Sequence, residues 1–110
     1  MLKMSTHASQ ERLERMVYLA TEIGIGETLV TITDRGRRTA LTEHGVVLVF
    51  DSSEAILTAY LANVDRAVAM MLQSKGENYH IPSAIINHIE KINRKHAKAL
   101  NYLNKICGYH

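Results

Sequence analysis

The stretch that decides the fold is residues 46–61, which read VVLVFDSSEAILTAYL. It begins with five consecutive apolar residues, 46–50, a run typical of a central strand covered on both faces. A polar turn at 51–54 follows, and residues 55–61 then form a second apolar strand. Because the connection is short, we expect the two strands to be antiparallel neighbours in one sheet.

Two further strands are predicted immediately upstream. Residues 29–33 are rich in β-branched side chains, residues 34–36 supply turn chemistry, and residues 38–42 continue the pattern. These features predict a β-hairpin. His44 and Gly45 interrupt the apolar pattern before the central strand begins, so we interpret them as a turn or bulge.

Helices are predicted on both sides of these strands. Residues 9–23 carry apolar side chains at helical spacing, and Gly24 ends the segment. Asn63 is a plausible N-cap for a second helix that ends at Gly76, and a third helix is expected from Pro82 to about Asn104. The predicted fold class is α+β: an N-terminal helix, a small antiparallel sheet of three to four strands, then two C-terminal helices, all packed on one face of the sheet.

Length and composition fit one globular domain. The chain has 110 residues, of which 46% are hydrophobic and 22% charged, values that exclude a disordered or fibrous chain. We therefore expect a single domain over 1–110, with a core at about 6–76 and a long basic helix at about 82–104.

Several protein classes are excluded or disfavoured. The lone Cys107 cannot form an intramolecular disulfide or a cysteine-based zinc site within one chain, and no cofactor or metal is expected. The chain lacks a Walker loop, a dinucleotide fingerprint and the common hydrolase motifs. It also lacks an apolar run of roughly 20 residues and an apolar leader, so we expect a cytoplasmic protein without membrane contact.

The charge is unevenly distributed. Residues 1–81 hold eight Lys/Arg and ten Asp/Glu, or −2, whereas residues 82–110 hold five Lys/Arg and one Glu, or +4. Basic side chains gather in a predicted hairpin tip and on the third helix, where they suit phosphate contacts, although a solvated tip is the alternative for the first group. The expected RNA- or phosphate-binding residues are Arg35, Arg37, Arg38, Lys91, Arg94, Lys95 and Lys98.

The last predicted strand displays two hydroxyl groups together. Alternation places Thr58 and Tyr60 on one face, and the first helix and the preceding turn contribute imidazole and guanidinium groups. A histidine titrates near neutral pH and can transfer a proton, while arginine donates to phosphate oxygens. This chemistry suits metal-independent RNA cleavage, for which the candidate catalytic residues are His7, Arg12, Arg15, His44, Thr58 and Tyr60.

Short motifs also resemble a known group of proteins. The tripeptide at 6–8, with arginines on the first helix, the segment 41–47 and the strand 56–60 together resemble the small ribonuclease toxins of the barnase, EndoU, colicin and RelE group, over about residues 6–62. The resemblance implies that an inhibitor or immunity protein is a partner. By the same resemblance His7 and His44 would be the acid and base, Arg12 or Arg15 the phosphate clamp, and Thr58 and Tyr60 the last-strand site residues. Leu61 and the long basic helix depart from the pattern of that group.

The third helix supports an alternative function. Its apolar side chains recur close to the spacing of a coiled-coil seam, and the seam, which includes His96, is longer than the rest of the domain requires. The chain would then be a non-catalytic interaction or assembly module, such as a phage or mobile-element protein. The seam would form a homodimer through Ile85, Ile89, Ile92 and Leu103. The helix could equally fold back and complete its own core.

Overall fold

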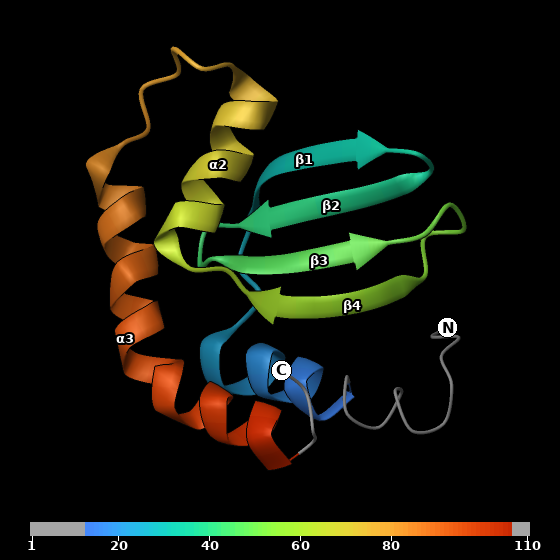
Figure 1. Cartoon of the computed structure of the whole chain (residues 1–110), viewed down its shortest axis with the longest axis vertical. Coiled ribbons are helices and arrows are strands. Elements are labelled where there is room, and N and C mark those ends of the chain that lie inside the picture. Colours follow the sequence, from blue (N-terminus) through green and yellow to red (C-terminus); the bar gives the residue numbers. More distant parts are fainter. Residues whose placement is uncertain (1–12, 107–110) are drawn as a thin grey trace.

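The protein is built on a four-stranded antiparallel sheet (Figure 1). The computed structural model describes residues 13–106, with side chains in the last helix described as far as Tyr102. The strands lie in the order β1-β2-β3-β4, so each is hydrogen-bonded to its neighbours in the chain. Their bounds are β1 (Thr28–Asp34), β2 (Arg37–Thr42), β3 (Val46–Phe50) and β4 (Ile56–Leu61). The predicted α+β class and antiparallel sheet are confirmed.

β3 is an internal strand covered on both faces, as its apolar run predicts. Val46 and Val47 are both fully buried although adjacent strand residues point to opposite faces. Val46 packs in a cluster with Leu19, Ala59 and Leu100, whereas Val47 packs in a separate cluster with residues of α2. Two small cores therefore lie on opposite faces of the sheet.

The first helix changes its geometry before it ends. Residues 13–18 are α-helical and continue as the π-helical turn η1 (Leu19–Ile23). Gly24 ends this segment with a φ of 86°, and its N–H donates to the carbonyl of Leu19 at 2.8 Å, the wider i→i−5 bond of a π-turn. The predicted end of the helix is confirmed, and the part predicted before residue 13 lies outside the described residues.

The second helix, α2 (Val64–Lys75), follows its predicted signals closely. The side chain of Asn63 accepts a hydrogen bond from the N–H of Arg66 at 2.8 Å, which satisfies one of the donors left without a partner at a helix start. Gly76 ends the helix with a φ of 109°. Ala67, Met70 and Met71 are its buried residues, and they pack on the same face of the sheet as Val47.

The long helix α3 (Ser83–Ile106) connects the two cores and corrects one expectation. Its Ile89 packs in the cluster of Val47, whereas its Leu100 packs in the cluster of Val46 on the opposite face. The helices therefore cover both faces of the sheet, and the predicted arrangement on one face is wrong. The reason is length, because a helix of 24 residues extends past the end of a small sheet and reaches its other side.

The apolar seam of α3 packs mainly against its own domain. Ile89 is only 1% exposed and Ile85 packs against the same cluster, so this part of the predicted dimer interface is already covered. Ile92 is half-buried, and the side chain of Leu103 lies outside the described residues. Within residues 13–106, no helix is long and apolar enough to cross a membrane.

Candidate nucleic-acid interface

A line of polar and basic side chains runs along the exposed side of α3. Steps of three and four residues bring them to one face of the helix, on the opposite side from Ile89. All are exposed, and from first to last they span about 21 Å at ~1.5 Å per residue. We call this set the α3 stripe; it consists of His88, Lys91, Lys95, Lys98 and Tyr102.

Arg94 lies beside the α3 stripe and is partly neutralised. Its guanidinium forms an ion pair with the carboxylate of Glu90, one helical turn earlier. The two side chains are 77% and 49% exposed, so the pair is worth little to stability. The three lysines of the stripe are consequently the stronger candidates for phosphate contacts.

A shallow depression opens beside the C-terminal part of the stripe. It has a volume of about 560 Å³ and is lined by Tyr18, Lys95, Lys98, Ala99 and Tyr102. Tyr102 is 64% exposed, an unusual position for a large aromatic side chain. Two tyrosines and two lysines thus border one surface hollow.

Tyr18, the residue that the first helix contributes to the hollow, is held in place by a hydrogen bond. The hydroxyl of Tyr18 lies 2.9 Å from Nδ1 of His96, and the two rings meet edge to face with centroids 5.8 Å apart. His96 is 8% exposed and sits on the buried side of α3. The seam histidine therefore has a hydrogen-bond partner within the domain, and this bond fixes the position of the Tyr18 ring.

His44, a predicted catalytic residue, is paired with a second histidine. Its Nδ1 lies 2.7 Å from Nε2 of His88, the first member of the α3 stripe. The ring centroids are 5.0 Å apart and the planes are tilted by 49°. At this distance one nitrogen donates and the other accepts, so the hydrogen bond links the β2–β3 turn to α3.

The His44 ring lies close to the backbone of Gly26. An added Cβ at Gly26 would lie 2.6 Å from Cδ2 of His44 and 2.9 Å from Cγ of Glu43. The same turn is tied down by the N–H of Glu27, which donates to the Glu43 carboxylate at 3.1 Å. The histidine pair thus depends on a close approach that only glycine permits.

Arg15 and Thr58, two of the candidate catalytic residues, meet in a buried contact. Arg15 is 6% exposed; its Nε donates to the carbonyl of Ala59 at 2.8 Å and its Nη2 donates to the hydroxyl of Thr58 at 2.9 Å. These bonds tie the first helix to β4, which is an edge strand. Because Arg15 is buried and two of its N–H groups have partners within the domain, the geometry favours a structural role.

The remaining predicted catalytic residues are not gathered at this contact. Tyr60 and Thr58 do share a face, since they are the register partners of Val47 and Val49, but Tyr60 packs against the α2-side core. His44 faces His88 in α3. His7 and Arg12 lie outside the described residues.

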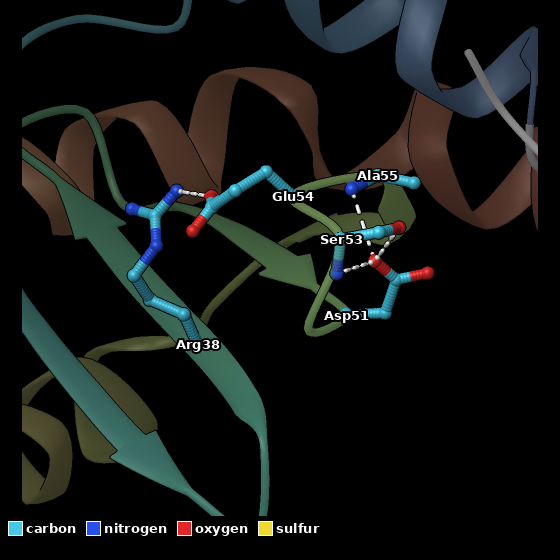
Figure 2. A network of polar contacts seen from close by, with 5 residues as sticks. All are labelled: Arg38, Asp51, Ser53, Glu54 and Ala55. Carbon is cyan, nitrogen blue, oxygen red and sulfur yellow. Dashed lines mark hydrogen bonds and ion pairs between the residues drawn. The ribbon is translucent and has the colours of Figure 1, made fainter.

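The three arginines predicted at the β1–β2 turn differ in their exposure and contacts. Arg35 and Arg37 are exposed, and Arg35 adopts a φ of 51° in the tight turn. Arg38 is engaged by its neighbours. It forms an ion pair with Glu54 (Figure 2), and its guanidinium lies over the Phe50 ring, 4.2 Å from the ring centroid. Arg35 and Arg37 are thus the exposed members of this cluster, and Arg38 is half-buried.

The β3–β4 turn that presents Glu54 is itself held by one carboxylate. Oδ1 of Asp51 accepts hydrogen bonds from the N–H and the hydroxyl of Ser53, at 2.8 and 2.7 Å, and from the N–H of Ala55 at 3.1 Å (Figure 2). Such local bonds are the reason that aspartate begins many turns. We therefore assign these Asp51 contacts the role of stabilising the β3–β4 turn.

Sequence reasoning missed three residues of the site. His88, Tyr18 and Tyr102 gain their roles from contacts across the fold, although the spacing of 88, 91, 95 and 98 could have revealed the stripe itself. Among residues 13–106, no group of three or more His, Cys, Asp and Glu is placed to hold a metal ion.

Comparisons with known proteins add no relative from which a function could be inferred. The chain matches no protein-family model, no curated protein and no solved structure.

Proposed function

We propose that the protein binds RNA along the α3 stripe. The observation that carries the proposal is the alignment of Lys91, Lys95 and Lys98 on one exposed helix face, with Tyr102 at its end. The segment that contains them has a net charge of +4, from five Lys/Arg and one Glu, while the rest of the chain is −2. The charge is thus concentrated where a phosphate backbone would lie.

The lysines suit phosphate contacts because each ammonium presents three donors on a long, adaptable side chain. Binding of this kind releases counterions and depends little on base sequence. The protein would therefore bind many RNA sequences with similar affinity at a given salt concentration.

The test compares the RNA affinity of two variants that remove positive charge. Lys91→Gln, Lys95→Gln and Lys98→Gln together remove the charge of the stripe and should weaken RNA binding about 10- to 100-fold at low salt. Replacing Arg66 and Lys75 by Gln removes positive charge from exposed positions away from α3 that are not candidate RNA contacts. Equal losses per charge removed in the two variants would reject the stripe as the binding surface.

A second candidate function is metal-independent RNA cleavage, and the His44–His88 contact favours it. Two imidazoles 2.7 Å apart bring two groups that can transfer protons to one place, and general acid–base cleavage needs two such groups. Lys91 lies one helical turn from His88 and would supply the cation for a charged phosphorane. In this version His88 takes the role that the sequence assigned to His7.

The reaction would be an internal transfer within RNA. The neutral imidazole removes the proton of a 2′-OH, the 2′-oxygen forms a bond to phosphorus, and the bond from phosphorus to the 5′-oxygen breaks. The departing 5′-oxygen takes the proton of the imidazolium. The products are a 2′,3′-cyclic phosphate and a 5′-hydroxyl, and the two rings must first separate to admit the phosphate.

Incubation with end-labelled RNA in EDTA tests this candidate. Cleavage should fall about 10²–10⁴-fold in His44→Ala and in His88→Ala, because each removes a proton-transfer group. His80→Ala, at an exposed position before α3, is the matched control. Absence of cleavage by the folded wild-type protein would reject the enzyme and leave RNA binding, or the assembly module, as the function.

A further inference from the structure

Tyr18 and Tyr102 border a hollow whose chemistry differs from that of a phosphate track. Phosphate contacts need only the lysines, yet the hollow of about 560 Å³ is lined by two aromatic rings and the methyl group of Ala99. Its size falls within the range of pockets that enclose small organic groups, about 300–1,000 Å³. An aromatic surface of this kind binds flat rings by stacking.

We propose that this hollow is a binding site for an unpaired nucleobase, so that the protein selects single-stranded RNA. The inference rests on the proposed function, because the lysines of the stripe bring the phosphate backbone to the hollow. To the proposed RNA binding it adds a preference for single-stranded over duplex RNA, and it names the residues that would cause this preference. A base in a duplex is stacked and paired on both sides and cannot enter, whereas a base in a single strand can turn outward.

The two tyrosines have complementary properties for this task. Tyr102 is 64% exposed, so its ring is available for contact and contributes little to the core. Tyr18 is half-buried and its hydroxyl is held 2.9 Å from Nδ1 of His96. One wall of the hollow is thus fixed before a base arrives, which lowers the entropic cost of binding.

Charge decides which side of Tyr18 the nucleic acid follows. A second shallow depression, of about 400 Å³, also borders Tyr18 and is lined by apolar side chains of the first helix together with Glu14 and Glu22. Carboxylates repel a phosphate backbone. The depression on the α3 side instead carries Lys95 and Lys98, whose ammonium groups can reach the phosphates that flank a stacked base.

The experiment measures the affinity of the full chain for three RNA probes of one length. These are a single strand, the same strand with abasic sites, and a duplex. Tyr102→Ala should weaken binding of the single strand about 5- to 150-fold, the equivalent of one lost stacking contact. Tyr102→Phe, which keeps the ring, should bind as the wild type does, and duplex binding should not change in either variant.

A fluorescent base reports the contact directly. The chain contains no Trp, so the emission of a 2-aminopurine placed in the single strand can be followed without a tryptophan background. Its emission should fall on binding to the wild type and to Tyr102→Phe, but not on binding to Tyr102→Ala. Circular dichroism of each variant checks that α3 is retained.

The outcomes separate this inference from the function on which it rests. The reference is the affinity of the wild-type protein for the unmodified single strand. If the wild type binds the abasic strand equally tightly, or if Tyr102→Ala binds the unmodified strand equally tightly, the base site is wrong. RNA binding itself still stands in that case, provided that the stripe lysines are required. If no RNA probe binds, both are wrong. Preference for the single strand that disappears in Tyr102→Ala alone would establish the site.

Discussion

At the scale of single residues, Gly26 shows how one missing side chain makes room for a contact between two histidines. Its φ of 79° belongs to the left-handed region that glycine favours, and the ring of His44 occupies the space where a Cβ would stand. The ring is thereby positioned to reach His88. The histidine pair therefore depends on a residue that takes no part in any chemistry.

We expect Gly26→Ala to destabilise the protein more than Gly76→Ala does. Both positions have positive φ, at 79° and 109°, but nothing lies within 4 Å of a Cβ at Gly76. Both variants carry backbone strain, and only the first displaces His44, with an additional loss of about 0.5–1.5 kcal/mol for the broken hydrogen bond. Urea unfolding measures the difference, which should shrink when both glycine variants are made in His88→Ala. Equal losses at the two glycines would show that the His44 ring moves aside without cost.

At the scale of elements, Arg15 joins the first helix to the edge of the sheet. An edge strand exposes backbone groups that can pair with another chain, and proteins commonly cover them. The bond from Nε of Arg15 to the carbonyl of Ala59 satisfies one such group at β4, and the bond to Thr58 adds a second tie. Arg15, which the sequence suggested as a phosphate clamp, thus covers part of the edge strand β4 in the fold.

We expect Arg15→Ala to lower the free energy of unfolding by about 1.5–3 kcal/mol, the range for hydrogen bonds to charged groups. Arg66→Ala, an exposed arginine on α2, is the matched control and should change stability by less than about 0.5 kcal/mol. Thermal or urea unfolding provides both values. If Arg15→Ala unfolds like the control and weakens RNA binding instead, the arginine contacts phosphate and its structural assignment is incorrect.

At the scale of the whole molecule, the two sides of α3 have different surroundings. One side packs Ile89 and Leu100 into the cores on opposite faces of the sheet. The other side presents the α3 stripe, and Figure 1 shows the helix running along the outside of the domain. Binding along the stripe would therefore leave the cores undisturbed.

The salt dependence of RNA binding should follow from this arrangement. For a single strand the logarithm of the affinity falls with the logarithm of the salt concentration by about 0.7 for each phosphate contacted. Removing Lys91, Lys95 and Lys98 should therefore reduce the slope by about 2. Titrations at several salt concentrations measure it, with the variant at Arg66 and Lys75 as the comparison. An unchanged slope would mean that the stripe lysines contact no phosphate.

The sequence by itself determined the elements of this protein. The apolar run at 46–50, the Asn63 cap and the glycines at 24 and 76 act through neighbouring residues, so their effects can be read along the chain. Even Thr58 and Tyr60 were placed on one face, because strand alternation is a local rule. The same rules account for the predicted order of helix, sheet and two helices.

Only the tertiary structure decided which side chains meet. His44 and His88 are 44 positions apart, Arg15 and Thr58 are 43 apart, and Tyr18 and His96 are 78 apart. The reach of α3 around the sheet, which places helices on both faces, likewise depends on how the completed layers pack. Such contacts depend on packing over the whole domain, and no spacing along the chain encodes them.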